Sequence, residues 1–190
     1  MAHERATTPS DEELVVRIRT QTPDDFRLVV ERYQQALFRY VLSYITDQAK
    51  AEDIVQEAFI KMYINLNSFD EARTFSAWAY RIVHNEMVSH LRKNQQDIIP
   101  DDDAWIPQLA DDRPSLAEDL DRKLSHQKLY RAIGRLPLKY RQVLILYYFQ
   151  GCDYESVATI TGVPASTVST RLSRAKARLK KILIKEHDDG

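Results

Sequence analysis

Residues 153–185 read DYESVATITGVPASTVSTRLSRAKARLKKILIK, and this stretch decides the fold that the rest of the chain supports. Asp153 precedes a short helical pattern, where its carboxylate can accept backbone N–H groups that the first turn leaves unpaired. Gly162 suits the left-handed turn that ends many helices, and Pro164 excludes a continuous helix through this point. We therefore predict two helices joined by a tight turn: residues 154–161 and residues 166–183.

The second of these helices has an apolar side and a basic side. Its apolar residues recur at spacings of three and four, as on one face of an α-helix: Val168, Leu172, Ala175, Leu179 and Ile182. Small hydroxyl residues and arginines fall on the opposite side or its flanks: Ser166, Thr167, Ser169, Thr170, Arg171, Ser173, Arg174 and Arg178. Residues 164–185 contain seven Lys or Arg and no Asp or Glu. This pattern is typical of a helix-turn-helix that reads DNA, although a basic helical hairpin can also be an ordinary solvated surface.

The composition bounds the fold class and the compartment. The 190 residues include 44% hydrophobic and 29% charged side chains but only four glycines, which fits a globular all-α protein. Cys152 is the single cysteine, so an internal disulfide is excluded. We find no signal-peptide pattern and no apolar run long enough for a membrane span. We therefore expect a cytoplasmic protein with no membrane insertion of its own.

Charge is distributed unevenly along the chain. The formal net charge is −1, but residues 94–121 carry nine acids and one base. So acidic a segment, with three prolines, favours a flexible linker over a packed element. We predict this organisation: an amino-terminal segment with a short helix (1–22), a helical domain (23–93), the acidic linker (94–121), a second helical domain (122–185) and a tail (186–190).

In the first domain, the predicted helix at residues 49–66 carries carboxylates on its outer side. Asp53, Gln56 and Glu57 lie away from the apolar stripe that includes Phe59. No histidine or cysteine stands at ligand spacing beside them, which disfavours a metal site. The residues alone leave two interpretations open: a solvated surface, or a docking surface for a basic partner.

A polar loop and a helix rich in aromatic and basic residues follow. The loop is NSFDEAR, residues 67–73, and the predicted helix is FSAWAYRIVHNEMVSHLRK, residues 75–93. Aromatic rings can stack on unpaired bases while cations follow the phosphates, so this mixture suits single-stranded nucleic acid. On spacing alone, an ordinary core helix with a few amphipathic aromatic residues is the simpler interpretation.

The sequence lacks the patterns of a catalytic or cofactor-binding protein. No nucleophile with its base, phosphate-binding loop, zinc spacing or dinucleotide fingerprint is present, and the histidines are scattered. We therefore expect no enzymatic activity, no cofactor and no metal site.

Three longer stretches, taken in order, point to a family. They are AEDIVQEAFIKMYINLNSF (51–69), FSAWAYRIVHNEMVSHLRK (75–93) and LPLKYRQVLILYYFQGCDYESVATITGVPASTVSTRLSRAKARL (136–179). Together they resemble the extracytoplasmic-function (ECF) group of bacterial sigma factors, within the sigma-70 family. The resemblance implies an all-α fold in which a region 2 helical bundle and a region 4 helix-turn-helix are joined by the acidic linker. It also implies a factor that binds core RNA polymerase and directs promoter-specific transcription initiation.

The same resemblance implies roles for particular residues. Core RNA polymerase is expected to bind Asp53, Gln56, Glu57 and Phe59. The unpaired minus-ten promoter element is expected to bind Asn67, Ser68, Phe69, Arg73, Trp78, Tyr80, Arg81 and Asn85. The minus-thirty-five element, as duplex, is expected to bind Ser166, Thr167, Ser169, Thr170, Arg171, Ser173, Arg174 and Arg178. An anti-sigma factor is the further partner that the resemblance implies, and the alternative function is that of a stand-alone helix-turn-helix regulator.

Overall fold

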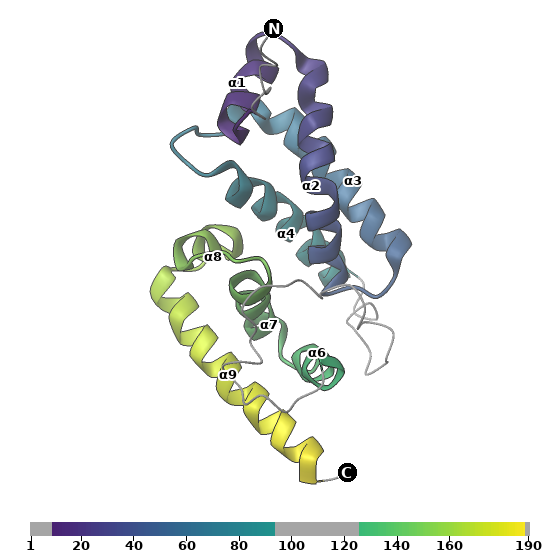
Figure 1. The fold of residues 1–190 in the computed structure, drawn as a ribbon, viewed down its shortest axis with the longest axis vertical. Helices are drawn as coiled ribbons and strands as arrows, with labels where there is room; N and C mark the ends of the chain where they lie inside the picture. The colour runs from purple at the N-terminus through teal and green to yellow at the C-terminus, as the bar shows by residue number, and fades with distance from the viewer. Residues whose placement is uncertain (1–8, 94–125, 189–190) are drawn as a thin grey trace, which may run out of the picture.

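The computed structural model describes residues 9–93 and 126–188, and every regular element in these two ranges is helical (Figure 1). The all-α prediction is therefore confirmed. The predicted acidic linker, residues 94–121, lies outside the described residues, and its flexibility stays a prediction. Within the two described ranges, no helix combines the length and the apolar composition that a membrane span needs.

The first domain is a bundle of three long helices with a shorter helix across one end. Its elements are α1 (Asp11–Thr20), η1 (Pro23–Asp25), α2 (Phe26–Leu42), α3 (Gln48–Asn65), η2 (Leu66–Ser68) and α4 (Phe75–Lys93). Helices α2, α3 and α4 pack against one another, and α1 lies beside the start of α2 (Figure 1). One side of α3 and several positions of α4 stay exposed to solvent.

Two helices of this domain begin at side-chain caps. The Ser10 hydroxyl accepts from the Glu13 N–H (3.1 Å), and the Glu13 carboxylate accepts from the Ser10 N–H (2.8 Å). At α3, the Asp47 carboxylate accepts from the Lys50 N–H (3.2 Å). Because these bonds satisfy N–H groups that a helix start leaves unpaired, they fix the points at which α1 and α3 begin.

The spacing of apolar residues in this part of the chain predicts a buried stripe of Phe26, Val30, Tyr33, Leu37, Val41 and Tyr44. Tyr33, Leu37, Val41 and Tyr44 are buried, whereas Phe26 and Val30 are only partly so. Val29 and Tyr40 are also buried, because α2 contacts α3 on one side and α4 on another. A helix placed between two neighbours needs a broader apolar stripe than a helix at a surface.

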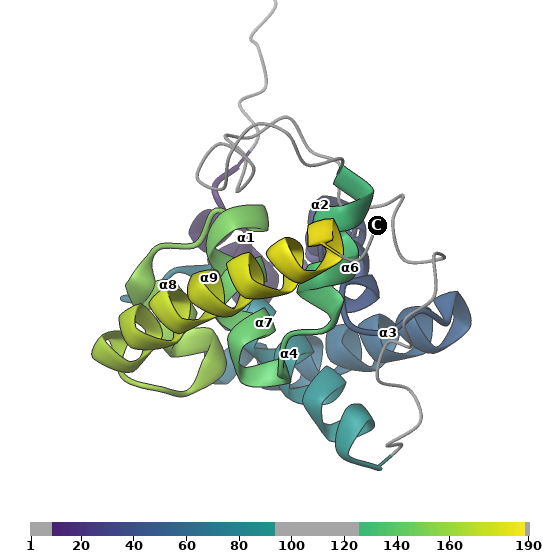
Figure 2. The ribbon, with the colours of Figure 1, turned by 90° about the horizontal axis from the view of Figure 1, so that it is seen from below.

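The second domain packs a long carboxy-terminal helix across shorter ones. Its elements are α6 (His126–Gly134), α7 (Leu138–Leu144), η5 (Ile145–Phe149), α8 (Tyr154–Thr161) and α9 (Ala165–Asp188). Figure 2 shows α9 crossing the other helices, and it contacts α6, α7 and α8. The helix-turn-helix predicted from residues 153–185 is therefore α8 and α9.

Residues 138–149 change helical geometry along their length. Helix α7 gives way at Ile145 to the π-helical segment η5, in which the Gln150 N–H donates to the Ile145 carbonyl (3.1 Å). Gly151 follows with a φ of 65°, a left-handed value that glycine adopts without strain. This turn carries the chain from α7 to α8.

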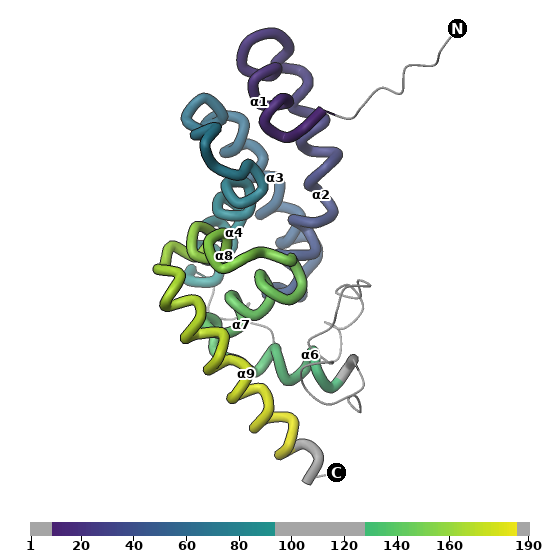
Figure 3. Tube along the Cα trace, turned by 60° about the vertical axis from the view of Figure 1, so that its left-hand side comes forward, coloured from purple at the N-terminus to yellow at the C-terminus, as the bar shows by residue number. Residues whose placement is uncertain are grey.

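The two domains contact each other through α4 and α8, which lie side by side in Figures 1 and 3. The Tyr80 hydroxyl of α4 donates to the side-chain oxygen of Gln150 (2.7 Å). Close by, the Arg141 guanidinium of α7 lies over the ring of Tyr44, 5.9 Å from its centroid. We call this contact the interdomain seam, and define it by Tyr44, Tyr80, Arg141 and Gln150.

Candidate functional site

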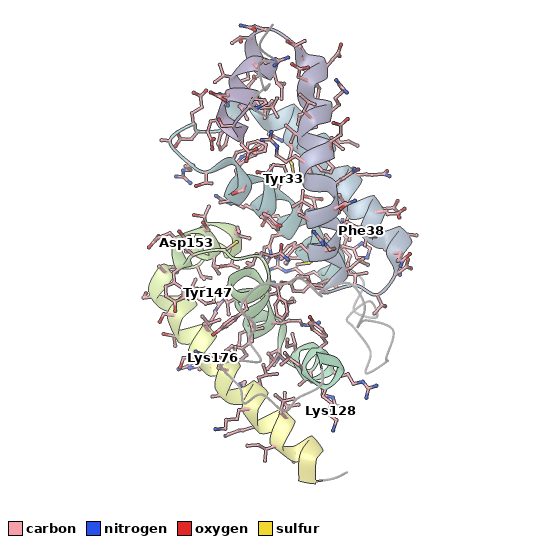
Figure 4. All side chains as sticks on the ribbon, in the orientation of Figure 1. Tyr33, Phe38, Lys128, Tyr147, Asp153 and Lys176 are labelled. Atoms are coloured by element: carbon pink, nitrogen blue, oxygen red, sulfur yellow. The ribbon has the colours of Figure 1, made fainter. Side chains whose placement is uncertain are left out.

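The outward face of α9 is set by a capped helix and a glycine turn before it. The Asp153 carboxylate, at the start of α8 in Figure 4, accepts from the Ser156 N–H (2.8 Å). Gly162 ends α8 in the left-handed conformation, with a φ of 68°. The predicted cap and the predicted turn are both confirmed. Together they fix the direction in which α9 leaves α8.

The rotational setting of α9 follows the sequence pattern. Its apolar side is buried against the domain core: Val168, Leu172, Ala175, Leu179 and Leu183. Its predicted DNA-facing residues are exposed, except for two that are half-buried: Thr167 and Arg171. The exposed ones are Ser166, Ser169, Thr170, Ser173, Arg174 and Arg178. The end of the stripe differs slightly, since Leu183 is buried and Ile182 is only partly so.

A basic notch lies between the start of α7 and the start of α9. It has a volume of about 370 Å³, and its lining is entirely polar or aromatic: Lys139, Tyr140, Ser166, Thr167, Thr170, Arg171 and Arg174. No carboxylate of the described residues lines it. Sequence reasoning assigned five of these residues to DNA and missed Lys139 and Tyr140. In the sequence these two residues are a Lys-Tyr pair at the start of another helix, and nothing local to them predicts that they lie beside α9.

The loop before α4 and the outer face of α4 form a second polar surface. Exposed here are most of the residues assigned to the minus-ten element: Asn67, Ser68, Arg73, Arg81 and Asn85. Trp78 is half-buried and packs against the rings of Phe69 (5.3 Å) and Phe75 (5.4 Å). Phe69 itself is only 4% exposed, so its ring supports the loop from inside. We therefore do not propose that Phe69 contacts the minus-ten element directly.

Arg19 holds this loop from α1. Its guanidinium donates to the Leu66 carbonyl (3.1 Å) and to the Phe69 carbonyl (2.6 Å). It also pairs with the Glu71 carboxylate at 2.6 Å. Helix α1 thereby orders a loop about 50 residues further along the chain, as the separation in the hydrogen bond to Phe69 shows. Sequence reasoning did not assign a role to Arg19.

Tyr80 is covered by the second domain. Its side chain is 9% exposed, and its hydroxyl is held by Gln150 at 2.7 Å. Its ring also meets the ring of Tyr40 edge-on, 5.3 Å between centroids. In this arrangement Tyr80 is covered, whereas Arg81 and Asn85 on the same helix are exposed.

His84 lies on α4 among the residues predicted to bind the minus-ten element, but its side chain is buried. Its Nδ1 is 2.7 Å from the Tyr40 hydroxyl, and burial lowers the pKa of His84 to about 4. The imidazole is therefore neutral at physiological pH. His84 supports α4 from within and adds no charge to its outer face.

The third surface is the outer face of α3. Asp53, Gln56 and Glu57 are exposed there, as predicted from the helical period. Phe59 differs, since it is 8% exposed and its ring meets Phe26 edge-on at 6.5 Å. Its apolar side chain fills the core, so of these four residues Asp53, Gln56 and Glu57 alone remain candidates for contact with a partner at this surface.

Apolar residues extend this surface along α3. Ile60, Tyr63 and Ile64 are 54%, 51% and 69% exposed, which is unusual for side chains of this size. Exposed apolar groups beside a polar rim are typical of a protein interface. Sequence reasoning missed these three residues because their spacing also fits a helix side that is simply solvated.

Comparisons with known proteins define the class. The Sigma-70 region 2 family model matches residues 29–96, and a Sigma-70, region 4 model matches residues 126–179. The first segment covers most of the first domain described above, and the second covers most of the second domain. The chain belongs to the sigma-70 family of transcription initiation factors, in its ECF group.

Individual relatives agree with this assignment. The chain is 32% identical to the ECF RNA polymerase sigma factor SigW of Bacillus subtilis (strain 168), over 89% of this chain and 94% of SigW. It is 30% identical to the RNA polymerase sigma-H factor of Pseudomonas aeruginosa, over 93% of this chain and 95% of that protein.

Solved structures show the same fold. The sigma factor RpoE of Bartonella quintana, solved in complex with the anti-sigma factor NepR, matches with a TM-score of 0.62 and 29% identity, covering 84% of this chain and 97% of RpoE. CnrH, solved with the cytosolic domain of CnrY, matches with a TM-score of 0.69 at 24% identity, over 93% of this chain and 99% of CnrH.

Proposed function

We propose that this sigma factor divides its work among three surfaces. The outer face of α3, with Asp53, Gln56 and Glu57, binds core RNA polymerase. The loop before α4 and the outer face of α4 hold the unpaired minus-ten element. The outward face of α9 reads the minus-thirty-five element in the major groove of duplex DNA.

One observation carries this proposal furthest. The side of α9 that faces solvent is made of small hydroxyl residues and arginines, while the opposite side is sealed in the core. Small residues such as Ser166 and Ser169 let a helix enter the groove closely, and Arg174 has the geometry to bond guanine edges. Residues 165–185 of this helix contain no acid, which a helix that only covers the core would not require.

The α4 surface supports a role with single-stranded DNA. Arg73 and Arg81 supply positive charge, and Asn85 supplies an amide that can pair with a base edge. Trp78 keeps part of its ring exposed, which suits stacking on an unpaired base. Phe75 and Tyr80 of the same helix are buried, as the interpretation of α4 as a core helix requires, so Trp78 is the aromatic residue of α4 that we propose for stacking.

The interdomain seam supports a dependence on polymerase. Because Tyr80 is closed by Gln150, part of the proposed minus-ten surface is unavailable while the domains remain in contact. We infer that the free chain binds promoter DNA weakly, and that docking on polymerase separates the two domains. Since RNA polymerase is the partner, we place the protein in the cytoplasm and assign it no catalysis of its own.

An anti-sigma factor is the second protein partner in this proposal. RpoE of Bartonella quintana was solved with its anti-sigma factor NepR, and that structure resembles this chain in fold and sequence. A partner that holds the seam closed would keep the factor inactive, because Tyr80 would stay covered. The chemistry of that partner is left to experiment.

Run-off transcription with purified core polymerase tests the proposal. Genomic fragments are transcribed with core alone, with this chain alone, and with both together. We expect discrete transcripts only from the combination, and weak unspecific binding of the free chain in a gel-shift assay. Tight, sequence-specific binding by the free chain, without polymerase-dependent transcripts, would instead favour the stand-alone regulator.

A further inference from the structure

Tyr140 is the meeting point of three cations in the second domain. It lies at the start of α7 and is 6% exposed. The Lys139 ammonium lies 5.2 Å from the centroid of its ring, and the Arg178 guanidinium carbon lies 5.1 Å from the same point. Both distances are within the range of about 6 Å in which a cation is attracted to an aromatic face.

A third cation, Arg174, lines the same notch as the phenol group. Burial by itself would raise the pKa of Tyr140. The cations Lys139, Arg174 and Arg178 outweigh burial, so the pKa of Tyr140 is lowered. One aromatic side chain therefore contacts cations from two helices, Lys139 from α7 and both arginines from α9.

These cations have no acidic counterpart nearby. Neither Lys139, Arg174 nor Arg178 forms an ion pair with a carboxylate in the described part of the chain, and the notch has no acidic lining. Like charges this close repel one another. Because the three cations are nevertheless held together, the electrostatic potential at this point of the surface is strongly positive. The notch also offers hydroxyl donors, among them Ser166 and Thr167. Such a site suits a phosphodiester group.

We propose that Tyr140 is a positioning residue for promoter recognition, and that the notch beside it binds one backbone phosphate of the minus-thirty-five duplex through Lys139. The ring of Tyr140 sets the positions of Lys139 and Arg178 as phosphate contacts. Its hydroxyl holds Arg174 in one orientation, toward a base edge. This inference rests on the proposed reading of duplex DNA by α9, and it assigns that reading to a residue of α7 as well.

Preorganisation is the physical reason for such an arrangement. A free arginine has many rotamers, and ordering it on binding costs conformational entropy. In our proposal the phenol of Tyr140 orients the guanidinium of Arg174 before DNA binds, which reduces this cost when Arg174 bonds its base. Tyr140 thereby affects which sequence is read without touching a base itself.

Two substitutions test separately the hydroxyl of Tyr140 and the proposed phosphate contact of Lys139. Tyr140→Phe keeps the aromatic face and removes the hydroxyl that we propose orients Arg174. Lys139→Ala removes the proposed phosphate ligand and leaves Tyr140 in place. Tyr154→Phe and Lys180→Ala are matched controls, because both residues are exposed and neither lines the notch. Thermal melting of each variant checks that the domain stays folded.

The assays use holoenzyme, formed from core polymerase and the full chain, on promoters with a randomised minus-thirty-five element. Tyr140→Phe is expected to reduce discrimination at one base position about fivefold or more, with the salt dependence of binding unchanged. Lys139→Ala is expected to weaken all sequences alike and to lower the slope of log affinity against log salt by about one. The two controls are expected to behave as wild type.

A scan with single methylphosphonate linkages identifies the phosphate. Neutralising one particular phosphate should weaken wild-type holoenzyme but not the Lys139→Ala variant, whose contact is already lost. If no linkage shows this pattern, or if Tyr140→Phe leaves the base preferences unchanged, the inference is wrong. If wild-type holoenzyme shows no minus-thirty-five preference at all, the failure lies instead in the proposed reading by α9.

Discussion

Tyr80 and Gln150 are joined by a hydrogen bond of 2.7 Å, although they lie in different domains and 70 residues apart. The bond connects α4, the proposed minus-ten helix, to the turn that leads into the helix-turn-helix. Tyr80 is 9% exposed as a result of its contacts, which include the ring of Tyr40 at 5.3 Å. The two proposed DNA-binding domains thus restrain each other in the free chain.

Gln150→Ala is expected to loosen this contact. The Tyr80 hydroxyl would lose this hydrogen bond while still largely buried, at a cost of about 1 kcal/mol to the closed arrangement. We expect the variant to bind a single-stranded minus-ten oligonucleotide about fivefold more tightly than wild type, in fluorescence polarisation. Ser156→Ala in the same domain serves as a control. Unchanged oligonucleotide affinity in Gln150→Ala would show that this bond does not limit access.

Arg141→Met is expected to have the opposite effect. The Arg141 side chain is 3% exposed, and its Nε and Nη1 have no hydrogen-bond partner, while its guanidinium faces the ring of Tyr44. Burial lowers the pKa of Arg141, which shows that its charge is poorly compensated. Replacing such a group by an apolar one of similar volume often stabilises the folded state, by about 1–4 kcal/mol.

The readouts for Arg141→Met are the melting temperature and the distance between domains. We expect a higher melting temperature, a closed arrangement in energy-transfer measurements between labelled α3 and α9, and less transcription with core polymerase. A lower melting temperature would mean that the guanidinium contributes more through its contacts than it costs through burial. Arg131→Met, at an exposed position of α6, is the matched control.

Reversing charge on α3 is expected to abolish polymerase binding. Asp53 and Glu57 are exposed and four residues apart, so both point to the same side of the helix. In the double variant Asp53→Arg, Glu57→Arg, attraction to a basic partner becomes repulsion, which costs several kcal/mol at an interface. We expect the loss of co-purification with core polymerase and an unchanged circular dichroism spectrum. Co-purification at wild-type yield would contradict the assignment, and Glu31→Arg, on an exposed part of α2, is the control.

His84 makes stability depend on pH. Its pKa is lowered to about 4 by burial, from an ordinary value near 6.5. Between these values the unfolded chain binds a proton that the folded chain does not, so stability is full above about pH 6.5 and falls toward pH 4. The loss reaches about 3 kcal/mol at the lower end. Burial also raises the pKa of Tyr40, which therefore keeps its proton throughout.

Urea unfolding of wild type and His84→Gln, each measured at a series of pH values, checks this expectation. Carboxylates also titrate in this range, so the informative quantity is the difference between the two proteins. That difference should change by about 3 kcal/mol between pH 7 and pH 4. A constant difference would mean that His84 is equally accessible to protons in the folded and unfolded states.

The buried side of a single helix and the points where it begins and ends could be predicted from sequence. The spacing of apolar residues and the capping residues on which they depend are local features. The side of α9 that carries Arg174 follows from the spacing of Val168, Leu172 and Ala175. The start of α8 follows from Asp153, and its end from Gly162. Each of these features depends on residues within a few positions of one another.

Features that depend on two helices could not be predicted in this way. The period of α7 places Tyr140 on a buried side, but it does not say that arginines from α9 will meet the ring. Likewise, the spacing of apolar residues in α4 does not predict that Tyr80 bonds Gln150 in the other domain. Resemblance to a family assigned Phe59 and Phe69 to partners, yet both are largely buried, because alignment records a position and not the direction of a side chain.

The seam also constrains how this protein can evolve. Tyr80 serves the contact with Gln150 in the free chain, and we propose that the same side chain meets DNA once the domains separate. A substitution there changes background activity and promoter choice together, so natural selection cannot adjust one without the other. Gln150 has no such second duty in our proposal. Among duplicated copies of this gene, substitutions at position 150 should therefore change the background activity while position 80 stays fixed. New promoter sets then arise without an increase in background activity.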